Sequence, residues 1–280
     1  MQRLTCLVMA VVVLGCEPVE PRRSNRAADI PDTSASAGGT ADSATAPVAP
    51  PAPAAPRTPP ESAQLLQPGD HHPGRVNTVT GETWLGLFEG DSGWALKATD
   101  VTVVAIPHAC TDTAGQKSGR RVGVDAPTAP LFLVRGVPGL RAIAVRTLLS
   151  ERQQLFPGQR RELELGTRGA RWTLAAYGSV PPPPPGRAAE GGIREYSLVA
   201  SRQAGRTQTV YAFRVAAGGA GLNAPPTVLW AGDLNGDGQL DLFVDLTTGQ
   251  QPGPLVLFAS SPADTTQLVR KVAEYQPGSC

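Results

Sequence analysis

The chain has 280 residues, with 25 Lys and Arg against 24 Asp and Glu and a formal net charge of +1. This balance, without a long basic stretch interleaved with aromatic residues, argues against a nucleic-acid partner. The part beyond residue 67 is long enough for one domain with a sizeable core, or for two small halves.

The amino terminus predicts export. Residues 1–15 carry one positive charge, Arg3, and an apolar run from Leu4 to Leu14 that only Thr5 interrupts. A run of this length is typical of a signal peptide and is too short to span a bilayer. It ends in the tetrapeptide VLGC, which resembles the lipobox of bacterial lipoproteins. The alternative is an ordinary secretory signal followed by an incidental cysteine.

The lipobox resemblance implies that Cys16 receives a diacylglyceryl group and becomes the first residue of the mature protein. The membrane would then be a partner through this lipid. Glu17 follows the cysteine, where the family's inner-membrane retention signal usually shows Asp. The expected location is therefore the cell envelope, lipid-anchored at the outer membrane.

Composition shifts abruptly after the signal. Residues 16–67 are rich in Pro, Ala, Ser and Thr, as in PVAPPAPAAPRTPP. Such a segment cannot bury enough apolar surface to offset its conformational entropy, so we expect a disordered tether. About fifty residues at roughly 5 to 6 Å times the square root of length span about 40 Å, which lets the folded part stand clear of the lipid.

Residues 68–280 have mostly two-residue periodicity and predict a β-rich globular domain. The expected strands lie at 83–88, 93–98, 101–106, 121–125, 131–134, 161–165, 171–177, 195–201, 207–215, 227–231, 240–246 and 255–260. Residues 140–154 and 264–274 fit a helix or a strand. The predicted fold class is mainly β, either a sandwich or barrel or two packed β subdomains.

The five prolines at 181–185 and the glycines at 186, 191 and 192 interrupt the strand pattern. This segment, 181–192, is either a boundary between two halves or a long surface loop within one domain. The sequence leaves both open.

Two cysteines remain after export and lipidation, because Cys6 leaves with the signal and Cys16 is acylated. Cys110 and Cys280 are expected to pair in a disulfide, as thiols in an oxidising compartment usually do.

The alternative to this disulfide is a transition-metal or catalytic cluster of His108, Cys110 and Asp112, which alternate along the chain. No second cluster supplies further ligands, and His71 and His72 are expected at the unstructured edge of the domain.

The most informative stretch is AGDLNGDGQLDLFVDL, residues 231–246. Its oxygen-bearing side chains alternate around Gly236 and Gly238, which tolerate the positive φ of a tight coil. Calcium prefers six to eight oxygen ligands, and a compact loop can supply many of them. The predicted metal ligands are Asp233, Asn235, Asp237, Asp241 and the backbone carbonyl of Gln239. The alternative is a tight hairpin with capping carboxylates.

The loop is not an EF-hand, because its twelfth position is Val244 and the following residues alternate like a strand. It resembles the Asp-rich hairpin loop of FG-GAP and VCBS-type repeats, which implies Ca²⁺ binding between two strands in a structural role. A single copy does not support a propeller. The order of a tryptophan, this loop, LFASS and a terminal cysteine also resembles exported bacterial proteins with one such loop, which implies no activity.

The remaining residues favour a protein that is not an enzyme. The four tryptophans (Trp84, Trp94, Trp172 and Trp230) lie in expected strands and fit a core better than a sugar platform. There is no G-x-S-x-G elbow, and three histidines give a Ser/His/Asp hydrolase little support. We expect a binding or structural role toward an envelope protein or a glycan. The alternative is an exported hydrolase of envelope or extracellular glycans that uses Asp241 or Asp245, which would need a cleft with two carboxylates or His.

Overall fold

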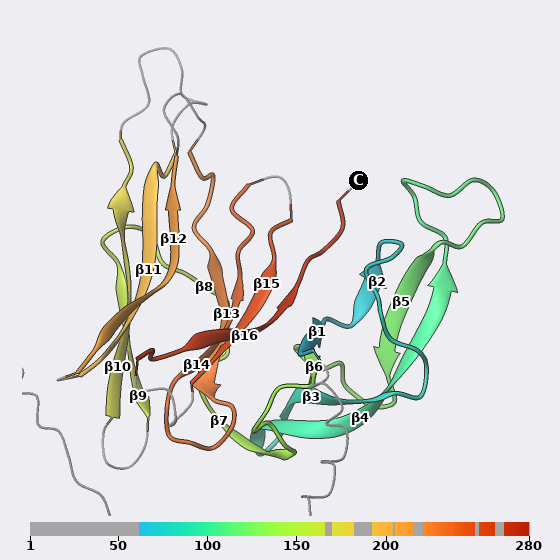
Figure 1. Ribbon diagram of the computed structural model, residues 1–280, viewed down its shortest axis with the longest axis horizontal. Coiled ribbons are helices and arrows are strands. Elements are labelled where there is room, and N and C mark those ends of the chain that lie inside the picture. Colours follow the sequence, from blue (N-terminus) through green and yellow to red (C-terminus); the bar gives the residue numbers. More distant parts are fainter. Residues whose placement is uncertain are drawn as a thin grey trace, which may run out of the picture. The chain divides into compact units, whose positions relative to one another are not determined.

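The computed structural model describes residues 62–165, 170–181, 192–203, 205–215, 221–249, 252–260 and 266–279. All of them belong to one compact unit, Pro56–Cys280. Within these ranges the regular elements are strands (Figure 1), so the mainly β fold class is confirmed. None of these described ranges contains a helix that is long and apolar enough to cross a membrane.

The strands in chain order are β1 (Gln64–Leu66), β2 (Gly69–His71), β3 (Thr83–Gly90), β4 (Gly93–Ile106), β5 (Gly119–Val124), β6 (Leu133–Arg135), β7 (Ile143–Leu149), β8 (Gln153–Gln154), β9 (Arg160–Leu165), β10 (Ala170–Ser179), β11 (Glu195–Arg202), β12 (Thr207–Arg214), β13 (Thr227–Asp233), β14 (Asp241–Asp245), β15 (Leu255–Ala259) and β16 (Arg270–Tyr275).

Most expected strands are present, and the differences have physical reasons. The segments 93–98 and 101–106 form one long strand, β4, and the two ambiguous segments contain β7 and β16 rather than helices. β1 begins inside the range assigned to the tether, because Leu65 and Leu66 are buried in the core. The expectation that His71 lies at an unstructured edge is wrong, since His71 ends β2 and is 5% exposed.

Twelve strands form one sheet that nearly closes into a barrel. Its order is β1-β6-β3-β4-β7-β13-β14-β15-β16, with β5 and β2 attached beside β4 and with β8 paired to β13. β1 at one end lies close to β16 at the other. The second sheet has the order β12-β11-β10-β9, and these four strands lie side by side in Figure 1.

Strands β13, β14 and β15 are buried on both faces, which explains their nearly continuous apolar sequences. Trp230 and Phe243 belong to one core with the inner residues of β1, β3 and β6. Val244 and Val256 belong to a second core, which they share with Trp172 of the four-stranded sheet. The β13–β14 hairpin therefore packs against a hydrophobic core on each of its faces. This packing fixes the positions of the two strand ends that the loop connects.

The proline-rich segment connects two neighbouring strands. Residues 182–191 lie outside the described residues, but β10 and β11 on either side pair antiparallel from Trp172↔Arg202 to Ser179↔Glu195. This pairing fits a loop within one sheet better than a boundary between two halves.

Candidate functional site

The predicted calcium loop connects β13 to β14, which pair antiparallel with Gly232 opposite Asp241. Gly236 and Gly238 have φ values of 81° and 74°. Side chains strongly disfavour this left-handed conformation, so the two glycines allow the chain to turn back within the loop. Asp233 is the last residue of β13, Asp241 is the first residue of β14, and Asp237 lies in the loop between them. The turn therefore brings three carboxylates into one short stretch of chain.

Asp233 holds the loop in its folded form. Its Oδ1 accepts hydrogen bonds from the N–H groups of Gly236 (2.8 Å) and Asp237 (3.0 Å), and its Oδ2 accepts one from Gly238 (2.9 Å). A short carboxylate that bonds nearby backbone donors is a common way to stabilise a turn. In this arrangement, Asp233 is directed toward the backbone of its own loop.

Asp241 is fully buried and connects the loop to the end of β15. Its Oδ2 accepts the N–H of Leu234 at 2.6 Å, and its Oδ1 accepts the N–H of Ser260 at 2.7 Å. The Ser260 hydroxyl lies 2.9 Å from the same Oδ1, and 3.1 and 3.2 Å from the two carboxylate oxygens of Asp237. Two carboxylates therefore converge on one serine.

The predicted amide ligand, Asn235, lies in the same cluster. Its Nδ2 donates to Asp237 Oδ2 at 3.0 Å and to the carbonyl of Ser260 at 3.4 Å, while its Oδ1 accepts the N–H of Asp237. Gln239 donates its backbone N–H to Asp237 at 2.8 Å. The fold thus brings Asn235, Asp237 and Asp241 together, and adds Ser260, which the sequence analysis did not assign.

Burial and a neighbouring negative charge disfavour ionisation at this site. Desolvation raises the pKa of Asp241 to about 7, and the charge of Asp237 acts in the same direction, although hydrogen bonds from Ser260 and Leu234 oppose both effects. Among the described residues, no Lys, Arg or His forms an ion pair with Asp233, Asp237 or Asp241. A buried carboxylate without a positive partner is costly, and a bound cation would lower this cost.

The chemistry of the donors fits calcium, because carboxylate, amide and hydroxyl oxygens are hard ligands. In the structure, these oxygen atoms form hydrogen bonds with backbone N–H groups and with neighbouring side chains of the same loop and of Ser260. In the part of the chain that the structure describes, no group of three or more His, Cys, Asp or Glu side chains is positioned to hold a metal ion. Calcium binding therefore remains a prediction from donor type, burial and charge.

The predicted lipidation residue Cys16 and the predicted disulfide partner Cys280 lie outside the described residues. Cys110 lies on an exposed loop between β4 and β5. Gly278 packs directly against the imidazole of His72, and the ring centroids of His72 and His108 are 4.1 Å apart. The end of the described chain thus reaches the loop that carries Cys110.

The alternative cluster of His108, Cys110 and Asp112 has another explanation. Asp112 accepts hydrogen bonds from the backbone N–H groups of His108 and Ser118 (both 2.8 Å) and from the Ser118 hydroxyl. These bonds from Ser118 lower the pKa of Asp112. Asp112 is thus an ionised carboxylate that stabilises its own loop. Both of its carboxylate oxygens accept hydrogen bonds from that loop.

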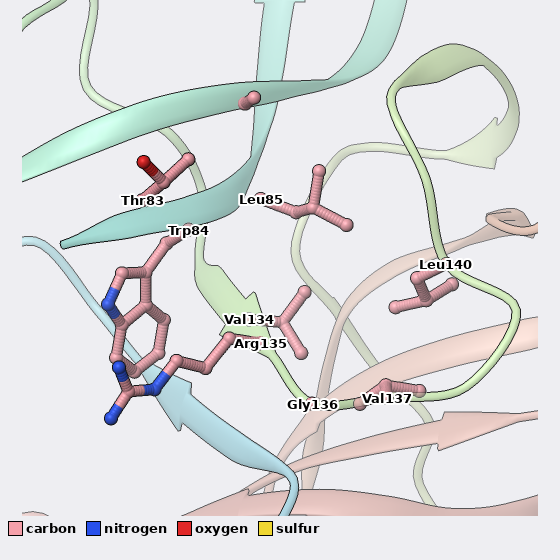
Figure 2. Close-up of a pocket in the computed structure, with 9 residues that line it drawn as sticks. Thr83, Trp84, Leu85, Val134, Arg135, Gly136, Val137 and Leu140 are labelled. Atoms are coloured by element: carbon pink, nitrogen blue, oxygen red, sulfur yellow. The ribbon is translucent and has the colours of Figure 1, made fainter. Parts of the chain in front are cut away.

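A cavity of about 190 Å³ lies beside Trp84 and Arg135 (Figure 2). The Arg135 guanidinium lies 4.7 Å from the Trp84 ring centroid, pairs with Glu82 at 2.6 Å and donates to Gln64 at 2.9 Å. Figure 2 shows Leu85 and Leu140 among its apolar lining. Because Arg135 is already paired and no carboxylate lines the cavity, we assign Arg135 to the packing of Trp84.

No protein-family model matches the chain, and no curated protein or solved structure matches it either. Function is therefore inferred from the residues and their geometry.

Proposed function

We propose that the chain is a lipid-anchored protein of the cell envelope, whose β domain is stabilised by calcium and has a binding rather than an enzymatic role. The observation that carries the calcium proposal is the buried Asp241 beside Asp237, with no basic side chain paired to either among the described residues. Calcium at the β13–β14 loop would neutralise these charges. The anchor rests on the lipobox resemblance at Cys16.

A hydrolase that uses Asp241 or Asp245 is the less favoured function. Asp241 is 0% exposed and accepts bonds from Leu234 and Ser260, so no substrate reaches it without opening the hairpin. Asp245 accepts the N–H of Thr247 at 2.8 Å. Four cavities lined by described residues each contain at most one carboxylate. The one that also has a histidine contains Asp112, whose oxygens bond their own loop.

Scanning calorimetry of the full-length protein in detergent tests the calcium proposal. We expect a higher melting temperature in millimolar calcium than in EGTA, because a ligand that binds only the folded state stabilises it. Magnesium at the same concentration is the control, since its smaller ion requires a stricter octahedral site. Identical melting curves in calcium and EGTA would reduce the loop to a hydrogen-bonded hairpin and overturn the proposal.

A further inference from the structure

The outer face of the four-stranded sheet carries an exposed aromatic residue above unusually short side chains. Cross-strand neighbours share a face, and the register places Tyr177 of β10, Ser197 of β11 and Ala212 of β12 in one row. Tyr177 is 60% exposed, whereas Trp84, Trp172 and Trp230 are at most 2% exposed. Tyr177 is therefore an aromatic side chain on this sheet that a ligand can reach.

A cavity of about 420 Å³ lies over this row. Its lining includes Tyr177 together with the short side chains of Ser197 and Ala212. These short side chains leave one side of the Tyr177 ring uncovered, and the volume is sufficient for one small ring.

An ion pair forms the polar side of the same cavity. Arg214 Nε and Glu195 Oε1 are 3.2 Å apart on neighbouring strands, with side chains 80% and 51% exposed. The pair presents hydrogen-bond donors and acceptors next to each other without a net charge. Adjacent hydroxyl groups of a pyranose both donate and accept, so they match such a pair, whereas an anion gains no net attraction from it.

We propose that the Tyr177 cavity binds a neutral saccharide, with the C–H face of a pyranose on the phenol ring and its hydroxyl groups on Glu195 and Arg214. This names a ligand class for the binding role proposed above and rests on that role. Aromatic rings carry negative charge on their faces, so they attract the slightly positive C–H groups of a sugar as well as burying apolar area.

The same face continues beyond the cavity. The next row holds Ala175 and Val199, which are only 8% and 7% exposed, and the row after it holds Ser201 and Thr207, whose hydroxyl oxygens are 3.1 Å apart. Rows on one face are separated by roughly 6.8 Å, or two residues of a strand. The buried row separates these hydroxyls from the cavity, so the contacts expected for the saccharide are those of the Tyr177 cavity.

Isothermal titration calorimetry of the full-length protein in detergent, with chitohexaose, cellohexaose and maltohexaose as probes, tests the proposal. We expect at least one probe to bind, Tyr177→Ala to weaken it tenfold or more, and Tyr177→Phe to retain it because the ring remains. Phe156→Ala is the matched control, since Phe156 is 45% exposed but does not line the cavity.

Two results would overturn the saccharide proposal: no binding of any probe at millimolar concentration, or equal binding by wild type and Tyr177→Ala at equal melting temperatures. Neither result changes the calcium-dependent melting temperature, so failure here is distinguishable from failure of the calcium proposal. Arg214→Ala provides a second variant, with an expected loss of binding and no change in fold, because its side chain is 80% exposed.

Discussion

His71 and Tyr275, 204 residues apart in the chain, form a buried hydrogen bond of 2.5 Å between Nδ1 and the phenol oxygen. His71 Nε2 lies 2.8 Å from the carbonyl of Gln67, which can only accept, so Nε2 carries the proton. Nδ1 is then an acceptor for the Tyr275 hydroxyl. The contact joins β2 to β16, near the place where the large sheet almost closes.

Tyr275→Phe is therefore expected to lower the free energy of unfolding by about 1 to 3 kcal/mol, because the Nδ1 acceptor of His71 loses its partner inside the protein. Urea unfolding at pH 7.5 measures this change. Tyr177→Phe is the control, since Tyr177 is exposed and its change is expected to stay within about 0.5 kcal/mol. Equal stability of the two variants would contradict a structural role for the His71–Tyr275 bond.

The same histidine predicts a loss of stability in mild acid. Burial lowers the pKa of His71, although its bond to Gln67 and the charge of Asp70 oppose the shift. Below about pH 6.5, the unfolded chain takes up a proton that folded His71 resists. The stability from neutral His71 is thus fully present above this pH and declines as pH falls.

Urea unfolding of wild type and His71→Gln at pH 7.5 and 5.5 measures this effect. His72 also has a lowered pKa, through partial burial and the nearby His108, so it contributes in the same direction. Comparison of the two proteins isolates the part due to His71. We expect the wild type to lose more stability than the variant, and an equal loss would contradict the assignment.

The disulfide prediction gains support from the position of the carboxyl end. Gly278 packs on His72, whose ring contacts His108, two residues before Cys110. We expect peptide mapping without reductant to find Cys110 and Cys280 in one linked species. In the chain-entropy model a loop of this length contributes about 4 to 5 kcal/mol, so Cys280→Ser is expected to melt at a lower temperature. Two alkylatable thiols in unreduced protein would show the pairing to be wrong.

Lipidation at Cys16 predicts a mature amino terminus that carries acyl chains. Mass spectrometry of the membrane fraction is expected to find this species, because the apolar run and VLGC together resemble a lipobox. Cys16→Ser removes the thiol that receives the lipid, so this precursor is expected to stall or to be released. Recovery of soluble, unacylated wild type would contradict the anchor, without bearing on the calcium loop.

Strands with a local alternating pattern are predictable from the sequence, whereas contacts between distant segments are not. Alternation within one segment predicted strands such as β10 and β11 well. β1 was missed because its three residues are too few to establish a period, and their burial depends on distant strands. His71 was misplaced for the same reason, since its partner Tyr275 lies at the other end of the chain.

The candidate site shows the same limit. The spacing of acidic residues located the β13–β14 loop, and its two glycines do adopt positive φ. The spacing could not identify Ser260, because that residue reaches Asp237 and Asp241 only through the pairing of β14 with β15. A serine after an apolar strand carries no local sign of this contact.

Asp237→Ala is expected to remove most of the calcium-dependent rise in melting temperature. Asp237 accepts hydrogen bonds from Asn235, Gln239 and Ser260, so its carboxylate lies at the centre of the proposed ligands. At a free calcium of about ten times the dissociation constant, which is about 1 to 10 mM for the affinity expected below, binding contributes about 1.4 kcal/mol, or a shift of a few degrees in a domain of this size. The affinity is expected near 10⁻⁴ to 10⁻³ M, which is typical of extracellular modules.

Asp245→Ala is the matched control, because Asp245 lies at the far end of β14 and bonds Thr247 rather than the loop. Calorimetry in calcium and in EGTA is expected to give a wild-type shift in Asp245→Ala and a small shift in Asp237→Ala. Both variants should remain folded, since the two cores on either side of the hairpin do not include these residues. If Asp237→Ala keeps the full shift, calcium binds elsewhere and the β13–β14 loop is not its site.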